Sequence, residues 1–261
     1  MTADHPSRYE AIAAFHTALF AAAPLDEATA PPDEATAPPD EATAPPDEAA
    51  APPEATVPPT ADSGGAGRAW RIAGWGSADL QRVRFEALLR TSGYRGGSVL
   101  DWGCGPADLY FFLRDTNLPL QYTGVDLDPR MVELASSRGA PDVSLLPEGR
   151  APEGTYDYVF ASGIFQFEDP SDPLYYLQIL EQAYDISSRA VAANFLSAER
   201  SEHAKAADEL YADPSTLARF AAAVTPRWVL DHGYHPQGAD FTIALLHERV
   251  TGGSGPSSGR S

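Results

Sequence analysis

Two acidic residues and a glycine turn carry the most specific chemical signal in this sequence. Asp101 closes a short apolar run and is followed by Gly103 and Gly105, and Asp126 closes the next apolar run, 23 residues after Gly103. The glycines let the backbone turn tightly and approach a ligand with no Cβ in the way. In an open α/β sheet, ligands bind at the carboxyl ends of the strands, where a carboxylate such as Asp126 can accept hydrogen bonds from both hydroxyls of a ribose. Together these residues predict a nucleoside-binding site.

The residue at position 108 narrows the choice of nucleoside. A dinucleotide fingerprint of the form GxGxxG requires a third glycine there, and this chain has Asp108. A carboxylate in the first turn of the following helix would repel a pyrophosphate bound at that helix terminus. S-adenosylmethionine has no phosphate and carries a sulfonium cation, so it tolerates the carboxylate, which also suits the helix dipole. The sequence therefore disfavours NAD and favours the methyl donor.

Alternating strands and helices must position these residues. The patterns predict strands at the run ending at Asp101 and at residues 121–125, 143–146, 156–161, 190–195, 228–232 and 241–247. Helices are predicted at residues 7–23, 79–91, 107–114, 129–137, 174–185 and 198–224, the last broken near Pro214. Five strand–helix units indicate a parallel sheet, and the short turn between the last two strands requires an antiparallel pair. The expected fold class is α/β: a doubly wound, mainly parallel seven-stranded sheet with a C-terminal antiparallel strand pair, an N-terminal helix and a disordered Pro-rich repeat.

A repeat divides the chain into four expected parts. DEATAPP occurs three times, followed by DEAAAPP and EATVPP, between residues 26 and 59. The paired prolines forbid a helix, and almost nothing apolar is available to bury, so the repeat is expected to be a disordered spacer and not a docking ligand. The parts are an N-terminal helix that is a candidate lid (1–23), the repeat (24–67), the main domain (68–250) and a flexible Gly/Ser tail (251–261).

Charge and cysteine content exclude several classes of partner. The formal charge is −19, and residues 26–62 hold ten carboxylates and no Lys or Arg. The remainder is only mildly acidic, so neither a nucleic acid nor an anionic membrane is expected as a partner. Cys104 is the only cysteine, which excludes an intrachain disulfide and a multi-cysteine zinc site, and no metal is expected. Asp4 and Glu10, and not a cationic cluster, precede the apolar stretch at residues 11–23, so it favours an amphipathic helix over an export signal, and a cytoplasmic location is expected.

Three segments resemble one enzyme family. VLDWGCGPADLYFFL, YTGVDLDPRMVELA and TYDYVFASGIFQF are similar to the first, second and fourth strand motifs of class I (Rossmann-like) S-adenosylmethionine-dependent methyltransferases. The resemblance covers residues 69 to about 247. It implies that Asp101, Gly103 and Gly105 contact the methionine portion of the cofactor, that Asp126 contacts the ribose, that Leu127 packs on the adenine and that residues 161–163 flank the sulfonium. The implied cofactor-binding set is Asp101, Gly103, Cys104, Gly105, Asp126, Leu127, Ala161, Ser162 and Arg84.

The roles of three residues in and around these motifs need separate comment. Arg84 could meet the cofactor carboxylate, but a solvated helix arginine is an equally good reading. Cys104 is expected to pack and not to act as a nucleophile. The family often has glycine where this chain has Ala107, and the alanine is expected to tighten the start of the following helix without loss of binding.

The methyl acceptor is not identified by the sequence. The Asn-Pro-Pro-Tyr type motif of amino-group methylation is absent after the fourth predicted strand. The leading expectation is a small-molecule or peptide acceptor. No catalytic residue is assigned; the candidates are His232, Tyr234 and Tyr211, with residues 194–197, Asp213 and His235 as further candidates for lining an acceptor pocket. Two alternatives remain: a protein that binds the cofactor without methyl transfer, and an interaction protein acting through its acidic Pro-rich repeat.

Overall fold

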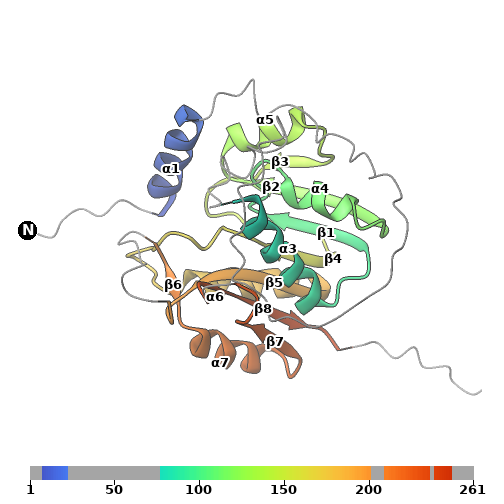
Figure 1. The fold of residues 1–261 in the computed structure, drawn as a ribbon, viewed down its shortest axis with the longest axis vertical. Helices are drawn as coiled ribbons and strands as arrows, with labels where there is room; N and C mark the ends of the chain where they lie inside the picture. Colours follow the sequence, from blue (N-terminus) through green and yellow to red (C-terminus); the bar gives the residue numbers. More distant parts are fainter. Residues whose placement is uncertain (1–7, 23–76, 201–208, 236–237, 249–261) are drawn as a thin grey trace, which may run out of the picture.

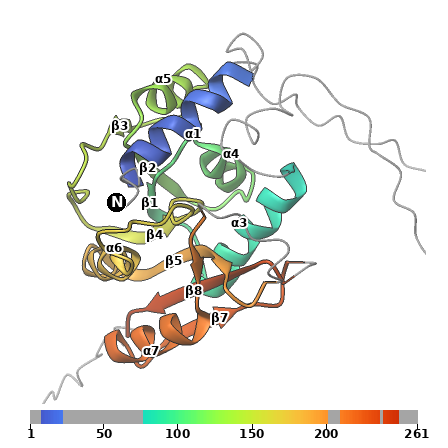
Figure 2. The same ribbon diagram turned by 90° about the vertical axis from the view of Figure 1, so that its left-hand side faces the viewer.

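The structure, a computed structural model, describes residues 8–22, 77–200, 209–235 and 238–248. The predicted disordered repeat at 24–67 and the tail at 251–261 lie outside the described residues. In the described part, one sheet forms a central layer with helices on both faces, and the N-terminal helix α1 (Arg8–Ala22) lies outside these layers next to α5 (Figures 1 and 2).

The sheet has the strand order β3-β2-β1-β4-β5-β8-β7, with β6 paired to β5 at its end. The pairs among β1 to β5 are parallel, whereas β8 pairs antiparallel with both β5 and β7. The bounds are β1 Gly97–Trp102, β2 Leu120–Asp126, β3 Val143–Leu145, β4 Tyr156–Ala161, β5 Ser187–Ser197, β6 Tyr211–Ala212, β7 Trp228–Asp231 and β8 Asp240–Leu246. The expected mainly parallel sheet with a C-terminal antiparallel pair is confirmed.

The helices divide between the two faces of the sheet. Their bounds are α3 Ala78–Ser92, α4 Asp108–Arg114, α5 Pro129–Ser137, α6 Tyr175–Asp185 and α7 Pro214–Val224. Leu88 of α3 and Leu113 of α4 pack with Val99 and Phe160 on one face. Leu180 of α6 and Leu217 of α7 pack with alternate residues of the same strands on the other face. Strand residues of both faces are buried, as the near-continuous apolar runs indicated.

The described residues in the first half of one predicted helix are not helical. Residues 198–224 were expected to be helical with a break near Pro214, but Tyr211–Ala212 is the short strand β6, and helix α7 begins at Pro214, while residues 201–208 lie outside the described part of the chain. Leu196 and Ser197 of β5 pair with β6. Asp213 then caps α7 by accepting hydrogen bonds from the amides of Ser215 (2.9 Å) and Thr216 (3.2 Å). Proline is suited to the first helical position, so here it starts a helix where the sequence analysis placed a break.

The loop between β1 and α4 contains a residue in an unusual conformation. Ala107 has φ 62° and ψ 34°, the left-handed region, and its side chain is fully buried against Tyr122 and Ala135. An L-residue pays about 1–2 kcal/mol for this conformation, which glycine adopts freely. The left-handed turn therefore gives the physical reason why glycine suits this position. The expectation of a merely tighter helix start missed this strain.

Ala107→Gly should cost much less stability than the matched substitution Ala135→Gly. Both alanines are fully buried in the same cluster, so each loses a similar methyl contact, about 0.8 kcal/mol. Ala135→Gly also places glycine inside a helix, for a total loss of about 2 kcal/mol, whereas Ala107→Gly relieves strain. Urea denaturation would measure the free energy of unfolding of both variants. Equal losses would contradict the strain at Ala107.

Candidate functional site

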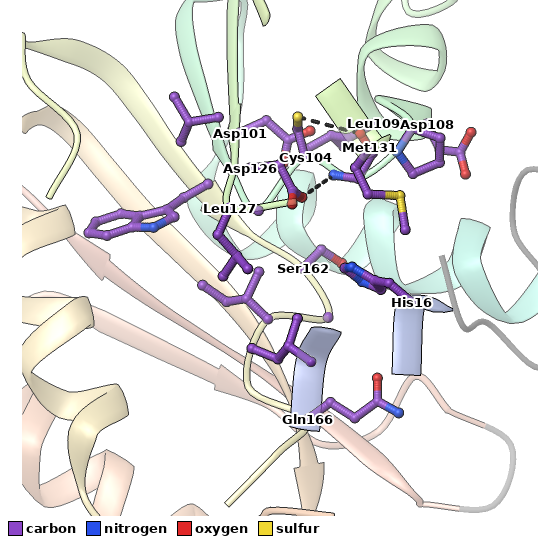
Figure 3. A pocket seen from close by; sticks show the side chains of 18 of the residues that line it. His16, Asp101, Cys104, Asp108, Leu109, Asp126, Leu127, Met131, Ser162 and Gln166 are labelled. Carbon is purple, nitrogen blue, oxygen red and sulfur yellow. Dashed lines mark hydrogen bonds between the residues drawn. The ribbon is translucent and has the colours of Figure 1, made fainter. Parts of the chain in front are cut away.

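A cavity of about 130 Å³ lies at the carboxyl ends of β1, β2 and β4, beneath α1 (Figure 3). The strand order reverses here, because the chain runs from β1 outward to β2 and β3 on one side and then continues with β4 and β5 on the other side of β1. Open α/β sheets bind ligands at such a switch point. The residues lining it from the sheet side include Asp101, Trp102, Gly103, Cys104, Gly105, Asp108, Val125, Asp126, Leu127, Met131, Leu146, Ser162, Gly163 and Ile164.

Asp101 is a buried carboxylate at the end of β1. It is 2% exposed and accepts a hydrogen bond from the Tyr122 hydroxyl at 2.8 Å. Burial raises the pKa of Asp101 to about 7, opposed by the Tyr122 hydrogen bond and assisted by the nearby Asp126. No Arg, Lys or His within the described residues forms an ion pair with it. The site therefore contains a carboxylate that a bound cation would stabilise in its ionised form.

Asp126, at the end of β2, joins three segments. One carboxylate oxygen accepts from the Gly105 amide at 2.8 Å, and the other accepts from the Asp128 amide at 2.9 Å. Burial raises the pKa of Asp126, while these two amides act in the opposite direction. Each carboxylate oxygen can accept more than one hydrogen bond, so Asp126 retains acceptor capacity toward the cavity.

Two further carboxylates, Asp108 at the cavity and Asp128 beside it, are paired with cations. Asp108 receives the Arg138 guanidinium at 2.7 Å and the Gln81 amide at 2.8 Å. Asp128 receives the Arg130 guanidinium at 2.6 Å. The uncompensated negative charge of the site is therefore concentrated on Asp101 and Asp126, which fits a ligand with a positive charge. Arg138 reduces the repulsion that Asp108 was expected to exert on a pyrophosphate. What remains as an argument against a dinucleotide is the presence of a side chain at position 108, where the fingerprint has its third glycine.

The glycines of the loop leave room in two different ways. A Cβ at Gly103 would lie 2.0 Å from a side-chain carbon of Ile164, so this glycine lets the loop after β4 approach β1. A Cβ at Gly105 would meet nothing within 4 Å, and Gly105 lines the cavity. The second glycine thus keeps open a space that a side chain would fill, as expected where a ligand approaches the backbone.

Helix α1 forms the roof of the cavity. Arg8, Ile12, Phe15 and His16 follow a helical spacing of four, three and one, and all four line the cavity. At one end of this face, His16 Nδ1 lies 2.9 Å from a carboxylate oxygen of Asp128. Figure 3 shows the His16 side chain reaching from α1 into the cavity that Asp101 and Asp126 face.

Further contacts dock α1 on both sides of the cavity. On the α5 side, Arg130 donates to the Thr17 hydroxyl at 3.1 Å and lies over the ring of Phe20 at 5.0 Å. On the opposite side, the Phe15 and Phe167 rings meet edge to face with centroids 5.3 Å apart. The helix is therefore held by contacts to elements at both walls.

Seven of the nine predicted cofactor-binding residues meet at this cavity: Asp101, Gly103, Cys104, Gly105, Asp126, Leu127 and Ser162. Ala161 does not line it; its side chain is 1% exposed and belongs to the core beside β5. Burial raises the pKa of the Cys104 thiol strongly, with Asp101 and Asp126 adding to the effect. A thiol held in its protonated form is a poor nucleophile, in line with a packing role.

Arg84 lies elsewhere, in a buried ion pair. Its guanidinium contacts the carboxylate of Asp240, whose side chain is 1% exposed. On α3, Leu80 and Val83 are only half-buried, whereas Gln81 and Arg84 are buried. Arg84 is buried because α3 packs on β8 and β5, and Asp240 at the start of β8 lies directly beneath it.

The three catalytic candidates also lie away from the cavity. The Tyr211 hydroxyl donates to Glu209. His232 packs edge to face on Phe241, with ring centroids 5.8 Å apart. The Tyr234 hydroxyl lies 3.5 Å from the Asn194 amide nitrogen, and burial strongly raises the pKa of Tyr234. None of them is among the residues that line the cavity.

The further acceptor-pocket candidates have structural partners. Asn194 receives the Ser162 hydroxyl at 2.7 Å and donates to Thr242 at 2.7 Å, so it orients one cavity residue from outside. Asp213 is the cap of α7. His235 is buried, and burial lowers its pKa. Neither Asp213 nor His235 lines the cavity.

The individual residues of the roof and of the wall after β4 were not predicted from the sequence. Arg8, His16, Gln166 and Phe167 all line the cavity. The helical spacing of Ile12 and Phe15 was visible, but nothing local indicated which element this face would cover. Within the described residues, no group of three metal-ligating side chains occurs, and none of the described helices has the length and apolarity to cross a bilayer.

Comparisons with known proteins find similarity to methyltransferases. Residues 99–186 match the family described as "Methyltransferase domain". A protein of Mycobacterium tuberculosis that bears the name "Putative methyltransferase Rv1506c" is 32% identical over 127 residues, which cover 46% of this chain and 75% of the relative.

Solved structures show the same fold. The magnesium protoporphyrin IX methyltransferase of Synechocystis PCC 6803, solved with S-adenosylhomocysteine, superposes with a TM-score of 0.50 and 13% identity, over 69% of this chain and 86% of the other. An S-adenosylmethionine-dependent methyltransferase of Archaeoglobus fulgidus gives a TM-score of 0.51 and 14% identity, over 66% and 95% of the two chains. At these identities the likeness concerns the fold alone.

Proposed function

Because the chain belongs to the class I S-adenosylmethionine-dependent methyltransferases, we propose that it transfers a methyl group from S-adenosylmethionine, its cofactor, to a small-molecule or peptide acceptor. The single observation that carries this proposal is the pair of buried carboxylates, Asp101 and Asp126, that face the cavity with no cationic partner in the described part of the chain. The catalytic domain is taken as residues 68–250, acting in the cytoplasm.

The cofactor's groups match the residues at the cavity. Asp101 would hold the ammonium of the methionine portion, because a cation there stabilises the ionised carboxylate. The open space at Gly105 would accept the ligand beside the backbone. Asp126 would receive the ribose hydroxyls on its remaining acceptor sites, and Leu127 would pack on the adenine. Ser162 and Gly163 would flank the sulfonium, with Ser162 oriented by Asn194.

The chemistry of methyl transfer requires little of this chain. The bound cofactor supplies an already activated methyl group. The protein must align the acceptor nucleophile with that methyl and exclude water. Phe15 and Ile12 of α1, opposite Ile164 and Phe167, form apolar walls suited to excluding water. No residue at the cavity is assigned as a general base, which methyl transfer requires only for some acceptors.

Helix α1 is proposed to be a lid over the cofactor. Its His16 and Thr17 contact the N-terminal turn of α5, at Asp128 and Arg130, directly beside Asp126. A bound cofactor would therefore lie between α1 and the sheet. This position of α1 favours a site that closes after the cofactor binds. The contacts between α1 and α5 would have to break before the cofactor could dissociate.

Asp126→Ala should weaken binding of S-adenosylhomocysteine by roughly 1.5–3 kcal/mol, the scale of hydrogen bonds to a charged group, or about 10- to 150-fold in Kd. Isothermal titration calorimetry would measure both proteins. Asp115→Ala, which removes a 73% exposed carboxylate far from the cavity, is the matched control and should bind normally.

NAD and NADP should not bind to the unmodified protein. Tighter binding of a dinucleotide than of S-adenosylhomocysteine would overturn the proposed function.

Cofactor affinity should depend on pH through Asp101. The pKa of Asp101 is raised to about 7 in the free protein, and a bound cation favours the ionised form. Affinity should therefore rise with pH between 5 and 7, by up to about tenfold per unit, and flatten above 7. The ligand's own α-amino group stays protonated across this window.

Asp101→Asn should bind S-adenosylhomocysteine more weakly and with a much smaller slope between pH 5 and 7. Calorimetric titrations of both proteins at half-unit intervals give the two profiles. Identical slopes would show that Asp101 does not meet the cofactor's cationic group.

Removal of α1 should speed release of the cofactor product. Deleting residues 1–67 should raise the dissociation rate of S-adenosylhomocysteine about tenfold, since two side-chain hydrogen bonds and the Phe20 contact are lost. Deleting only residues 25–67 keeps α1 and should leave the rate unchanged. Stopped-flow displacement measures both. A normal rate without α1 would exclude a lid, and a fast rate in both proteins would assign a role to the repeat.

A further inference from the structure

One cation at the cavity has no ionic partner among the residues that the structure describes. Arg8, at the start of α1, lines both the main cavity and a second cavity of about 270 Å³ beside it. Its guanidinium lies 4.1 Å from the centroid of the Tyr175 ring and 4.7 Å from that of the Tyr9 ring. The buried Nε has no hydrogen-bond acceptor, and no carboxylate of the described residues lies within the 4.0 Å of an ion pair.

The neighbouring arginines differ from Arg8 in this respect. Arg130 is paired with Asp128, Arg138 with Asp108, and Arg84 with Asp240. Three of the four arginines around the cavity and its helices therefore have their charge balanced by the protein. The charge of Arg8 is instead supported by two aromatic faces, which hold a guanidinium in position.

Three acidic residues, Glu148, Asp169 and Asp172, line the second cavity with Arg8, and the last two are engaged by their own loop and by α6. Asp169 accepts the Ser171 hydroxyl at 2.6 Å and the Ser171 amide at 3.0 Å. The Ser171 hydroxyl is the largest influence that lowers the pKa of Asp169, and Arg8 adds the smallest share. Asp172 accepts the Gln178 side-chain amide at 2.6 Å. These carboxylates lie near Arg8 without pairing with it.

The surface between Arg8 and the cofactor loop is largely apolar. Arg8 and His16 are eight residues apart, about 12 Å along the helix. Ile12 and Phe15 fill the roof between them, and Ile164, Phe167 and Ile179 face it from the loop after β4 and from α6. A molecule bound here would meet hydrophobic walls and one cation at its far end. An anionic group nearer the sheet would be repelled by Asp101 and Asp126.

We propose that Arg8 is the anion-binding residue of the acceptor site, and that the methyl acceptor is a small, largely apolar molecule carrying a carboxylate. This inference rests on the proposed function and names the substrate class of that same site. The planar guanidinium fork matches the two oxygens of a carboxylate, which can be bound by two parallel hydrogen bonds. The apolar remainder of the acceptor would extend along Ile12 and Phe15 toward the methyl group.

The test uses the protein saturated with S-adenosylhomocysteine and two probes that differ in charge. Phenylacetate and phenylacetamide share the ring and the shape, but only the first is an anion. Calorimetry on the loaded wild type should give at least about tenfold tighter binding of phenylacetate, the scale of hydrogen bonds between charged groups. Arg8→Gln should lose this preference. Arg150→Gln is the matched control, since Arg150 lines only the second cavity and has Glu153 at 3.9 Å; it should keep the preference.

Each outcome decides the matter. A preference for the anion in the wild type and in Arg150→Gln, but not in Arg8→Gln, supports the proposal. Equal binding of the two probes, or no binding of either, overturns it. Loss of S-adenosylhomocysteine binding in Arg8→Gln would assign Arg8 to the cofactor instead and would also overturn it. Failure of the wild type to bind S-adenosylhomocysteine would refute the proposed function itself, which keeps the two failures distinguishable.

Discussion

The two hydrogen bonds of the Asp126 carboxylate hold the site together. One fixes the amide of Gly105, in the loop after β1, and the other fixes the amide of Asp128, at the start of α5. Two loops that leave neighbouring strands are thereby tied to one buried group. Asp128, positioned in this way, accepts from Arg130 and meets His16 of α1. Loop, helix terminus and roof thus depend in turn on a single side chain at the end of β2.

Burying that carboxylate has an electrostatic consequence. Asp126 and Asp101 are 6% and 2% exposed, and no described residue forms an ion pair with either, although the nearby His16 acts to lower the pKa of Asp126. Desolvation raises the pKa of both groups, which means that the free site holds negative charge at a cost. A cationic ligand would remove that cost. The same acidity discourages an anion near the sheet, so a negatively charged group of an acceptor fits only at the far end of the roof, at Arg8.

The roof combines anchoring with recognition. His16, Thr17 and Phe20 contact α5, whereas Arg8 and Phe15 contact residues of the opposite wall. A helix that bridges a cavity in this way can cover one ligand and contact a second. The same residues along one face of α1 could therefore couple closure over the cofactor to selection of the acceptor.

The sequence alone was sufficient for most of the elements, though not for β6, and for the sheet side of the site. The apolar runs, the glycine turn, Asp126 and the helix pattern at residues 129–137 are local signals, since each depends on residues near one another in the chain, and they predicted β1, β2 and α5 with their ligand-facing ends. Tertiary structure alone decided which polar groups pair. Arg84 and Asp240 are 156 residues apart, and His16 and Asp128 are 112 residues apart. Local patterns do not encode such pairings, because they arise only when the folded sheet brings distant segments together. For the same physical reason, Arg84 was expected at the cofactor and was found in the core, while Arg8 and His16 became part of the site when α1 packed across it.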